Sequence, residues 1–230
     1  MATHFTILGR GRAGRALAGA LGDTVALKSH EAMPDGIDGF VLLALPDSAI
    51  PECAPKFAGR CVHLSGSLHI DGVPSLHPLV SFDGTAKDWR GIPLAVTGEP
   101  PKLILDAFIS LGFVPFDLPP ELKPLYHACA VLASGHAATL WVAANLLLKA
   151  SGINLPGRGM MGLAESTLNN VKQHGRGGIT GPFVRRDEDT IQRDSAALPP
   201  EWRGLFEGLG RMVMEDLAFH PGSKQNGTGP

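Results

Sequence analysis

The sequence has little of what marks several common classes of protein. Its three cysteines are an odd number without C-x-x-C spacing, so we expect neither a disulfide framework nor a metal site. The net charge of −2 gives no indication of nucleic acid binding. We find no signal-peptide features and no stretch that approaches the roughly 20 apolar residues needed to span a bilayer. We therefore expect a soluble, cytoplasmic protein that binds neither nucleic acid nor a membrane.

What the chain does have is apolar material for one large domain or two modest ones. Of its 230 residues, 44% are hydrophobic and 18% are charged, as in globular proteins. Short apolar runs typical of buried strands alternate with helical segments in the first half. The expected strands are 5–8, 24–27, 40–45, 61–64, 92–96 and 114–118, and the expected helices 12–21 and 102–111. This alternation predicts an α/β domain, with a mostly parallel sheet covered by helices on both faces.

The pattern changes after residue 118. From 119 to 219 we find no convincing strand, and apolar residues recur at helical spacing. Helices are expected over 124–149 and 160–174, from near 187, and over 201–218. We therefore predict an N-terminal domain at 1–118, an all-α domain at 119–219, and a disordered tail at 220–230 that has no apolar periodicity.

A glycine-rich turn follows the first expected strand. The stretch FTILGRGRAGRALAGALG has the spacing G-x-G-x-x-G, in which Gly9 permits a tight turn, Gly11 a close approach of phosphate, and Gly14 close helix packing. A strand, a turn and a helix in this order direct backbone N–H groups at a pyrophosphate. The predicted cofactor contacts are Gly9, Arg10, Gly11, Arg12, Ala13 and Gly14. The alternative is a tight turn that binds nothing.

The end of the second expected strand indicates which dinucleotide is bound. In NAD sites, an acidic residue at this point holds the ribose hydroxyls. Here Lys28, Ser29 and His30 offer a cation and hydrogen-bond donors, and the arginines of the turn add positive charge. We therefore predict the 2′-phosphate of NADP, with NAD the less favoured cofactor. The alternative is that these are solvated surface charges.

Several motifs in a fixed order resemble those of one family. They are LLALPDSAI, VHLSGS, SLHPLVSF, YHACAVLAS and TGPFVRRD. Over residues 5–219 the chain resembles Rossmann-like proteins with a C-terminal domain of unknown function, DUF2520, often labelled NADP oxidoreductases. That family lies within the wider set of 6-phosphogluconate dehydrogenase-like, ketopantoate reductase-like and pyrroline-5-carboxylate reductase-like enzymes. The resemblance implies a Rossmann-type sheet domain followed by a helical domain, and a homodimer built through the helices.

The resemblance also implies site residues and shows two departures. Beside the cofactor it places Leu45, Pro46 and Asp47, and near the nicotinamide Leu64, Ser65 and Gly66; ligands of open α/β sheets bind at such strand ends. At 134–135 the chain reads Ser-Gly where the family commonly reads Ser-Asn. At 185–187 it reads Arg-Arg-Asp where the family often reads Arg-Gly-Asp.

Histidines are the candidates for proton transfer, because hydride transfer needs one group that gives or takes a proton near neutral pH. His77 is held extended by the proline that follows it. His127 begins the long expected helix, and Ser134 lies about 20° from it on the same face. We predict that His127 or His77 is the proton donor and that Ser134 is a positioning hydroxyl. The alternatives are a turn contact for His77 and a helix contact for His127.

Substrate contacts are expected from the start of the long helix and from the loop GITGPFVRRD. Tyr126 adjoins His127, while Thr180, Gly181 and Arg185 offer a hydroxyl, an N–H group and a cation. The alternatives are packing for Tyr126 and neutralisation of the arginine by nearby acidic residues. The sequence thus predicts an NADP-dependent oxidoreductase acting on a small carbonyl or imine compound. The alternative is a sensor or scaffold protein that binds NADP(H) without catalysis.

Overall fold

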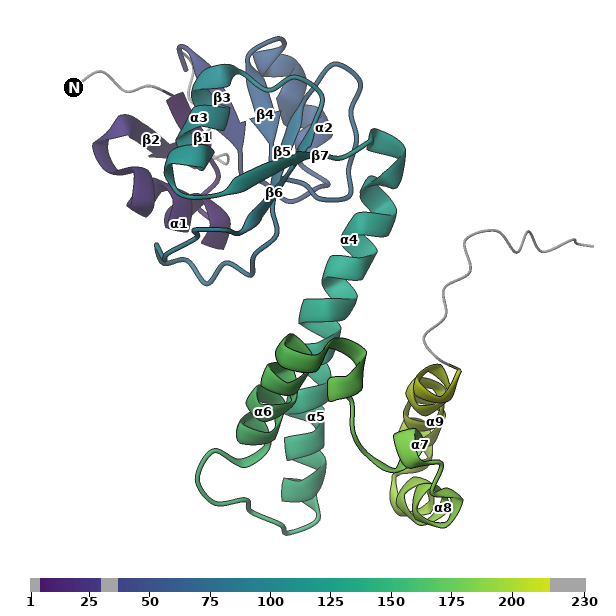
Figure 1. Ribbon diagram of the computed structural model, residues 1–230. Helices are drawn as coiled ribbons and strands as arrows, with labels where there is room; N and C mark the ends of the chain where they lie inside the picture. Colours follow the sequence, from purple (N-terminus) through teal and green to yellow (C-terminus); the bar gives the residue numbers. More distant parts are fainter. Residues whose placement is uncertain (1–4, 30–36, 216–230) are drawn as a thin grey trace, which may run out of the picture. The chain divides into compact units, whose positions relative to one another are not determined.

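Figure 1 shows the computed structural model, which describes residues 5–29 and 37–215. The chain forms two compact units that separate between Leu140 and Trp141. The first unit therefore includes the beginning of the long helix, and the domain boundary after residue 118 stays a prediction. Two other predictions, for His30 and for the tail at 220–230, concern positions outside the described residues.

Within the described residues, the first unit contains a seven-stranded sheet with the order β2-β1-β3-β4-β5-β6-β7. Neighbouring strands are parallel, except that β5 and β6 are antiparallel. The strands are β1 (Phe5–Leu8), β2 (Val25–Lys28), β3 (Phe40–Leu43), β4 (Cys61–His63), β5 (Ser75–Pro78), β6 (Pro93–Thr97) and β7 (Val114–Asp117). The helices beside the sheet are α1 (Arg12–Leu21), α2 (Ile50–Cys53) and α3 (Lys102–Ser110). The predicted α/β class is confirmed.

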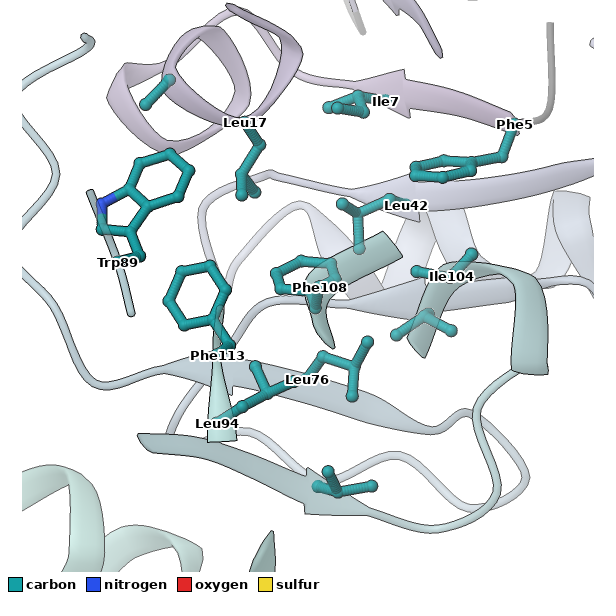
Figure 2. Close-up of a cluster of buried hydrophobic side chains, with 13 residues drawn as sticks. Phe5, Ile7, Leu17, Leu42, Leu76, Trp89, Leu94, Ile104, Phe108 and Phe113 are labelled. Atoms are coloured by element: carbon teal, nitrogen blue, oxygen red, sulfur yellow. The ribbon is translucent and has the colours of Figure 1, made fainter. Parts of the chain in front are cut away.

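Helices cover both faces of this sheet. On β1, Ile7 belongs to the buried cluster of Figure 2, whereas its neighbour Leu8 belongs to a second cluster. Helices α1 and α3 supply Leu17 and Phe108 to the first cluster, and α2 supplies Ile50 to the second. Each of these five side chains is fully buried, which stabilises the fold by about 1.5–3 kcal/mol per side chain relative to exposure. The central strands are continuous apolar runs because neither face meets water.

Strand β5 was not predicted from the sequence. It reads SLHP and ends in proline, so it has neither an apolar run nor clear alternation. It pairs with β6 in the antiparallel direction, with Ser75 opposite Thr97 and His77 opposite Ala95. The segment predicted only to be extended is therefore part of the sheet, and this pairing fixes the position of His77.

The predicted helix over 124–149 is present but not uniform. It consists of α4 (Lys123–Val131), a π-helical turn over Leu132–His136, and α5 (Ala137–Ala150). A π turn adds one residue to a helical turn and is frequent at functional sites. Residues after it are consequently rotated from the positions that a regular α-helix would give them.

The expectation that no stretch is long and apolar enough to span a bilayer was wrong for this helix. Pro120–Ala150 is long and apolar enough to cross a membrane by length and composition, and it is the one such helix in the described ranges. Its most apolar part is not buried in the structure. A single helix of this kind is weak evidence for a membrane, because core helices of other proteins pass the same test. Between Lys123 and Lys149 this helix has no charged residue, but polar residues such as His127, Ser134 and His136 divide it into shorter apolar runs.

The second unit is helical, and past β7 the described residues contain no further strand. After α5 come α6 (Gly159–His174), α7 (Pro182–Arg185), α8 (Glu188–Ala197) and α9 (Pro200–Met214). The predicted capping of α8 is confirmed, since the Asp187 side chain accepts a hydrogen bond of 3.2 Å from the backbone N–H of Thr190. The last predicted helix, 201–218, is confirmed as far as Met214, and residues 216–218 are outside the described part.

Candidate functional site

The glycine turn has the geometry that its spacing predicts. Gly9 has a φ of +123°, and a Cβ atom there would collide with the carbonyl oxygen of Ala44. A Cβ atom on Gly14 would collide with the carbonyl oxygen of Gly9, so the start of α1 packs directly on the turn. A Cβ atom on Gly11 would meet open space instead. Gly9 and Gly14 thus form the turn, and Gly11 leaves room above it.

The N-terminus of α1 opens into that room. Gly11 is its N-cap residue with an extended backbone, and no side chain among the described residues caps the helix. Its first turn contains no acidic residue. The first N–H groups of a helix carry partial positive charge and need acceptors. This end of α1 is therefore suited to a phosphate group.

A groove of about 370 Å³, here called the first groove, lies beside the turn. It follows the carboxyl ends of β1, β3 and β4, the edge at which open parallel sheets bind ligands. Predicted residues that line it together are Gly11, Arg12, Ala13, Leu45, Pro46, Asp47, Leu64, Ser65, Gly66, His77 and His127. The structure thus brings together segments that the sequence places up to 116 residues apart. Gly9, Arg10 and Gly14 are in the turn but are not lining residues.

A second groove, of about 570 Å³, adjoins the first through three shared residues, His77, Val80 and His127. The predicted residues Tyr126 and Ser134 also line it, with apolar side chains from the same helix. Its other lining residues are Leu79, Ser81, Cys129, Ala130, Val131 and Ala133. Among the described residues, no aspartate, glutamate, lysine or arginine lines this second groove.

His77, Tyr126 and His127 form one cluster where the grooves meet. His77 Nδ1 and the Tyr126 hydroxyl are hydrogen-bonded at 3.0 Å. The imidazoles of His77 and His127 lie edge to face, with ring centres 5.8 Å apart. Burial, then His127 and Lys123, lowers the pKa of His77 to about 4, and burial raises the pKa of Tyr126 to about 12. At neutral pH, His77 is therefore uncharged and Tyr126 keeps its proton.

Ser134 shares the groove with His127, as the helical spacing predicts. Its hydroxyl donates a hydrogen bond of 2.6 Å to the carbonyl oxygen of Ala130, one turn earlier. Since the proton is used in that bond, the hydroxyl oxygen can only accept a hydrogen bond from a ligand. Ser134 lies within the π turn, which alters the rotation expected for a regular α-helix.

Asp47 and Ser65 connect the loops after β3 and β4. The Ser65 hydroxyl donates to Asp47 Oδ2 at 2.8 Å and accepts from the backbone N–H groups of Ser67 and Leu68, at 3.2 and 2.8 Å. The backbone N–H of Ser65 donates to Nδ1 of the buried His63 at 3.2 Å. The loop at the end of β4 is therefore fixed by side-chain hydrogen bonds on both sides.

Lys123 is a site residue that the sequence reading missed. It is 1% exposed, and its Nζ donates to the Ser65 carbonyl oxygen at 2.9 Å and to Ser75 Oγ at 2.6 Å. Burial lowers its pKa to about 8, and Asp47 opposes that shift. Two features of the sequence could have indicated Lys123. It begins a helix, where a cation opposes the helix dipole, and it lies four positions before His127, on the same helix face.

The remaining predicted residues lie elsewhere. Lys28 and Ser29 come at the end of β2, and the Lys28 carbonyl oxygen accepts the Gly9 N–H at 2.9 Å. Arg10 is exposed, and its carbonyl oxygen accepts a hydrogen bond from Arg15. Thr180, Gly181 and Arg185 belong to the second unit and line neither groove as described. Their predicted contact with substrate stays a prediction.

The chain was compared with known proteins. Residues 92–213 match the family described as "Domain of unknown function (DUF2520)". No curated protein matches the chain. Among solved structures, it is similar to a proposed NADP oxidoreductase from Bacteroides fragilis, with a TM-score of 0.76 and 20% identity over 92% of this chain and 97% of that one.

Two further structures support the same fold. A protein from Thermotoga maritima has a TM-score of 0.70 and 20% identity over 92% of this chain and 97% of its own. A reductive aminase from Aspergillus terreus, in complex with NADPH and ethyl levulinate, has a TM-score of 0.60 and 16% identity over 94% of this chain and 95% of its own. At these identities the likeness establishes a Rossmann-like fold. Because the family match spans more than half of the sequence, the chain belongs to the DUF2520 family.

Proposed function

We propose that this protein is an NADP-dependent oxidoreductase that reduces a small carbonyl or imine compound or catalyses the reverse reaction. One observation carries the proposal: the groove that begins at the uncapped N-terminus of α1 ends at the imidazoles of His77 and His127. A phosphate-binding end and a proton-transfer end thus share one groove. The similar aminase from Aspergillus terreus holds NADPH, which supports the same cofactor here.

The residues present fit this cofactor. The glycine turn leaves open space above Gly11, where the pyrophosphate would accept the first N–H groups of α1. Arg10, Lys28, Ser29 and His30 would bind the 2′-phosphate, although His30 lies outside the described residues. Leu45, Pro46 and Asp47 would lie beside the cofactor, and Leu64, Ser65 and Gly66 near its nicotinamide. When bound, NADPH supplies the hydride.

The second groove would hold the substrate, because it adjoins the proposed nicotinamide end. Reduction of a carbonyl or imine adds a hydride to carbon and a proton to oxygen or nitrogen. We assign the proton to His127, with His77 as the alternative donor. A neutral imidazole is a poor acid, so the low pKa of His77 favours a role in orienting the Tyr126 hydroxyl. Ser134 would accept a hydrogen bond from the substrate.

The experiment has two stages. Calorimetric titration with NADPH and NADH tests the cofactor, and the assignment is overturned if neither of the two binds. NADPH oxidation is then measured with small oxo acids and cyclic imines for the wild type, His127→Ala and His77→Ala. His136→Ala is the matched control, because His136 is on the same helix, is exposed and lines neither groove. NADPH binding without turnover of any substrate would instead support a sensor or scaffold.

We also propose a homodimer through the helices of the second unit. Large apolar side chains are exposed along α5 and α6, among them Val142, Leu146, Leu163 and Leu168. Contiguous exposed apolar surface marks an interaction site. Analytical ultracentrifugation should give twice the chain mass for the wild type and a lower mass for Leu146→Lys with Leu163→Lys. A wild-type monomer that floats with lipid vesicles would contradict the dimer and indicate a membrane surface.

A further inference from the structure

The side chain of Lys123 joins three segments around the two grooves. Lysine is rarely fully buried, yet Lys123 is 1% exposed. It begins α4, and its ammonium donates to the carbonyl oxygen of Ser65, in the loop after β4, and to the hydroxyl of Ser75, on β5. Those segments carry the residues at which the grooves meet: α4 carries Tyr126 and His127, and β5 carries His77.

Lys123 acts on the site through the peptide that joins Ser65 to Gly66. A Cβ atom added to Gly66 would lie 2.8 Å from the imidazoles of both His77 and His127. The backbone of Gly66 thus lies directly against both rings. A displacement of this peptide would move the rings or leave a gap beneath them, and only Lys123 holds its carbonyl oxygen by a side-chain hydrogen bond among the described residues.

The charge of Lys123 acts on the same site. It lowers the pKa of His77 and of His63, in addition to the larger effect of burial on each. The other charged or titratable groups that act on these residues are Asp47, His69 and His127, and Asp47 opposes Lys123 at both imidazoles. Removing the ammonium would therefore make His77 easier to protonate, and both ring nitrogens of a protonated His77 are hydrogen-bond donors.

We propose that Lys123 is a positioning residue, whose buried ammonium fixes the peptide between Ser65 and Gly66 against His77 and His127. Lys123 itself is not among the described residues that line either groove, so it acts through its neighbours. A buried charge is not needed for stability, since an apolar side chain of similar volume often serves as well or better. The expected fall in kcat without the ammonium rests on the proposed function. The expected changes in amide exchange and in the pKa of His77 do not.

The variant Lys123→Met keeps an unbranched side chain that is one atom shorter, and it removes the charge and the donors. We expect faster hydrogen exchange at the amides of Ser67 and Leu68, and an upward shift in the pKa of His77 on the order of half a unit by NMR titration. We expect kcat to fall about 10- to 100-fold with KM within threefold. Lys149→Met is the control, because Lys149 is exposed on the same continuous helix; it should change none of these quantities.

A folded Lys123→Met protein with wild-type amide exchange and an unchanged His77 pKa would overturn the proposal. If that variant does not fold, Ser75→Ala decides, since it removes one of the two acceptors and keeps the charge. The proposal then requires faster exchange at Ser67 and Leu68, and wild-type exchange would refute it. Exchange and titration need no substrate. A wild type that fails to bind NADPH would therefore refute the proposed function and leave the test of Lys123 intact.

Discussion

The first unit should lose stability as the pH falls from about 6.5 to about 4. His63 is fully buried, and burial, then the charge of Lys123, lowers its pKa to about 4. The pKa of His77 is also lowered to about 4, mainly by burial. In the unfolded chain both imidazoles titrate near 6.5. Between these values the unfolded state binds more protons, so the free energy of unfolding is largest above pH 6.5 and decreases through this window.

The expected loss in the free energy of unfolding is large compared with the total stability of a domain. A lowering of the pKa from 6.5 to about 4 corresponds to about 3 kcal/mol for each imidazole. The total free energy of unfolding of a domain is roughly 5–15 kcal/mol. Asp83 and Asp88 also have a lowered pKa, because each accepts hydrogen bonds from neighbouring side chains, but they titrate below about pH 4. The loss between pH 6.5 and 4 is therefore assigned to the two histidines.

Urea unfolding at several pH values between 4.5 and 7.5 measures this loss. Trp89 is buried in the core of the first unit and reports its unfolding, provided that Trp141 and Trp202 are replaced by phenylalanine. His63→Gln should remove about half of the pH dependence, whereas His174→Gln, at an exposed histidine, should leave it unchanged. The reasoning is refuted if stability is constant over this range, or if the His63 variant retains the full dependence.

Four further predictions concern the turn, the cofactor and the buried lysine. Gly14→Ala should lower the free energy of unfolding by about 2 kcal/mol in thermal denaturation, because its Cβ would collide with the Gly9 carbonyl oxygen. Gly11→Ala, its matched partner, should keep the melting temperature and weaken NADPH binding at least about tenfold; equal binding would contradict the phosphate site. Lys28→Ala should weaken NADPH about tenfold by calorimetry and leave NADH unchanged; equal losses would argue against 2′-phosphate recognition. Stability should rise between about pH 8 and 10.5 in the wild type more than in Lys123→Met, since the lowered pKa of Lys123 lets the unfolded state bind more protons there.

Much of the first groove could be predicted from sequence because it depends on few local rules. The family resemblance implied that the loops at 45–47 and 64–66 lie beside the cofactor, and the rule that parallel strands place their carboxyl ends at one edge of a sheet agrees with it. The spacing of Gly9, Gly11 and Gly14 located that turn without further information. The structure supplies the neighbouring strands β1, β3 and β4 that bring these loops together, and it confirms that these residues line one groove or form the turn beside it.

The parts that escaped prediction depend on contacts distant in sequence. Strand β5 is short, ends in proline and is stabilised by antiparallel pairing with β6, so SLHP alone carries no strand signal. The π turn comes from one additional residue within an alanine-rich helix, and no residue in it is specific to that conformation. The pairing of His77 with Tyr126 joins residues 49 positions apart and requires both features to be known.

The buried ammonium shows most clearly why residue type alone misleads. A lysine at the start of an exposed-looking helix is normally solvated, and its charge is unfavourable beside the positive end of the helix dipole. Here two acceptors, Ser65 and Ser75, lie within reach on separate segments, and Asp47 supplies a nearby negative charge. None of these partners is recognisable until the sheet is assembled. A charged residue that opposes the dipole of its own helix is therefore a reason to look for distant acceptors, because the local sequence offers no compensation for its position.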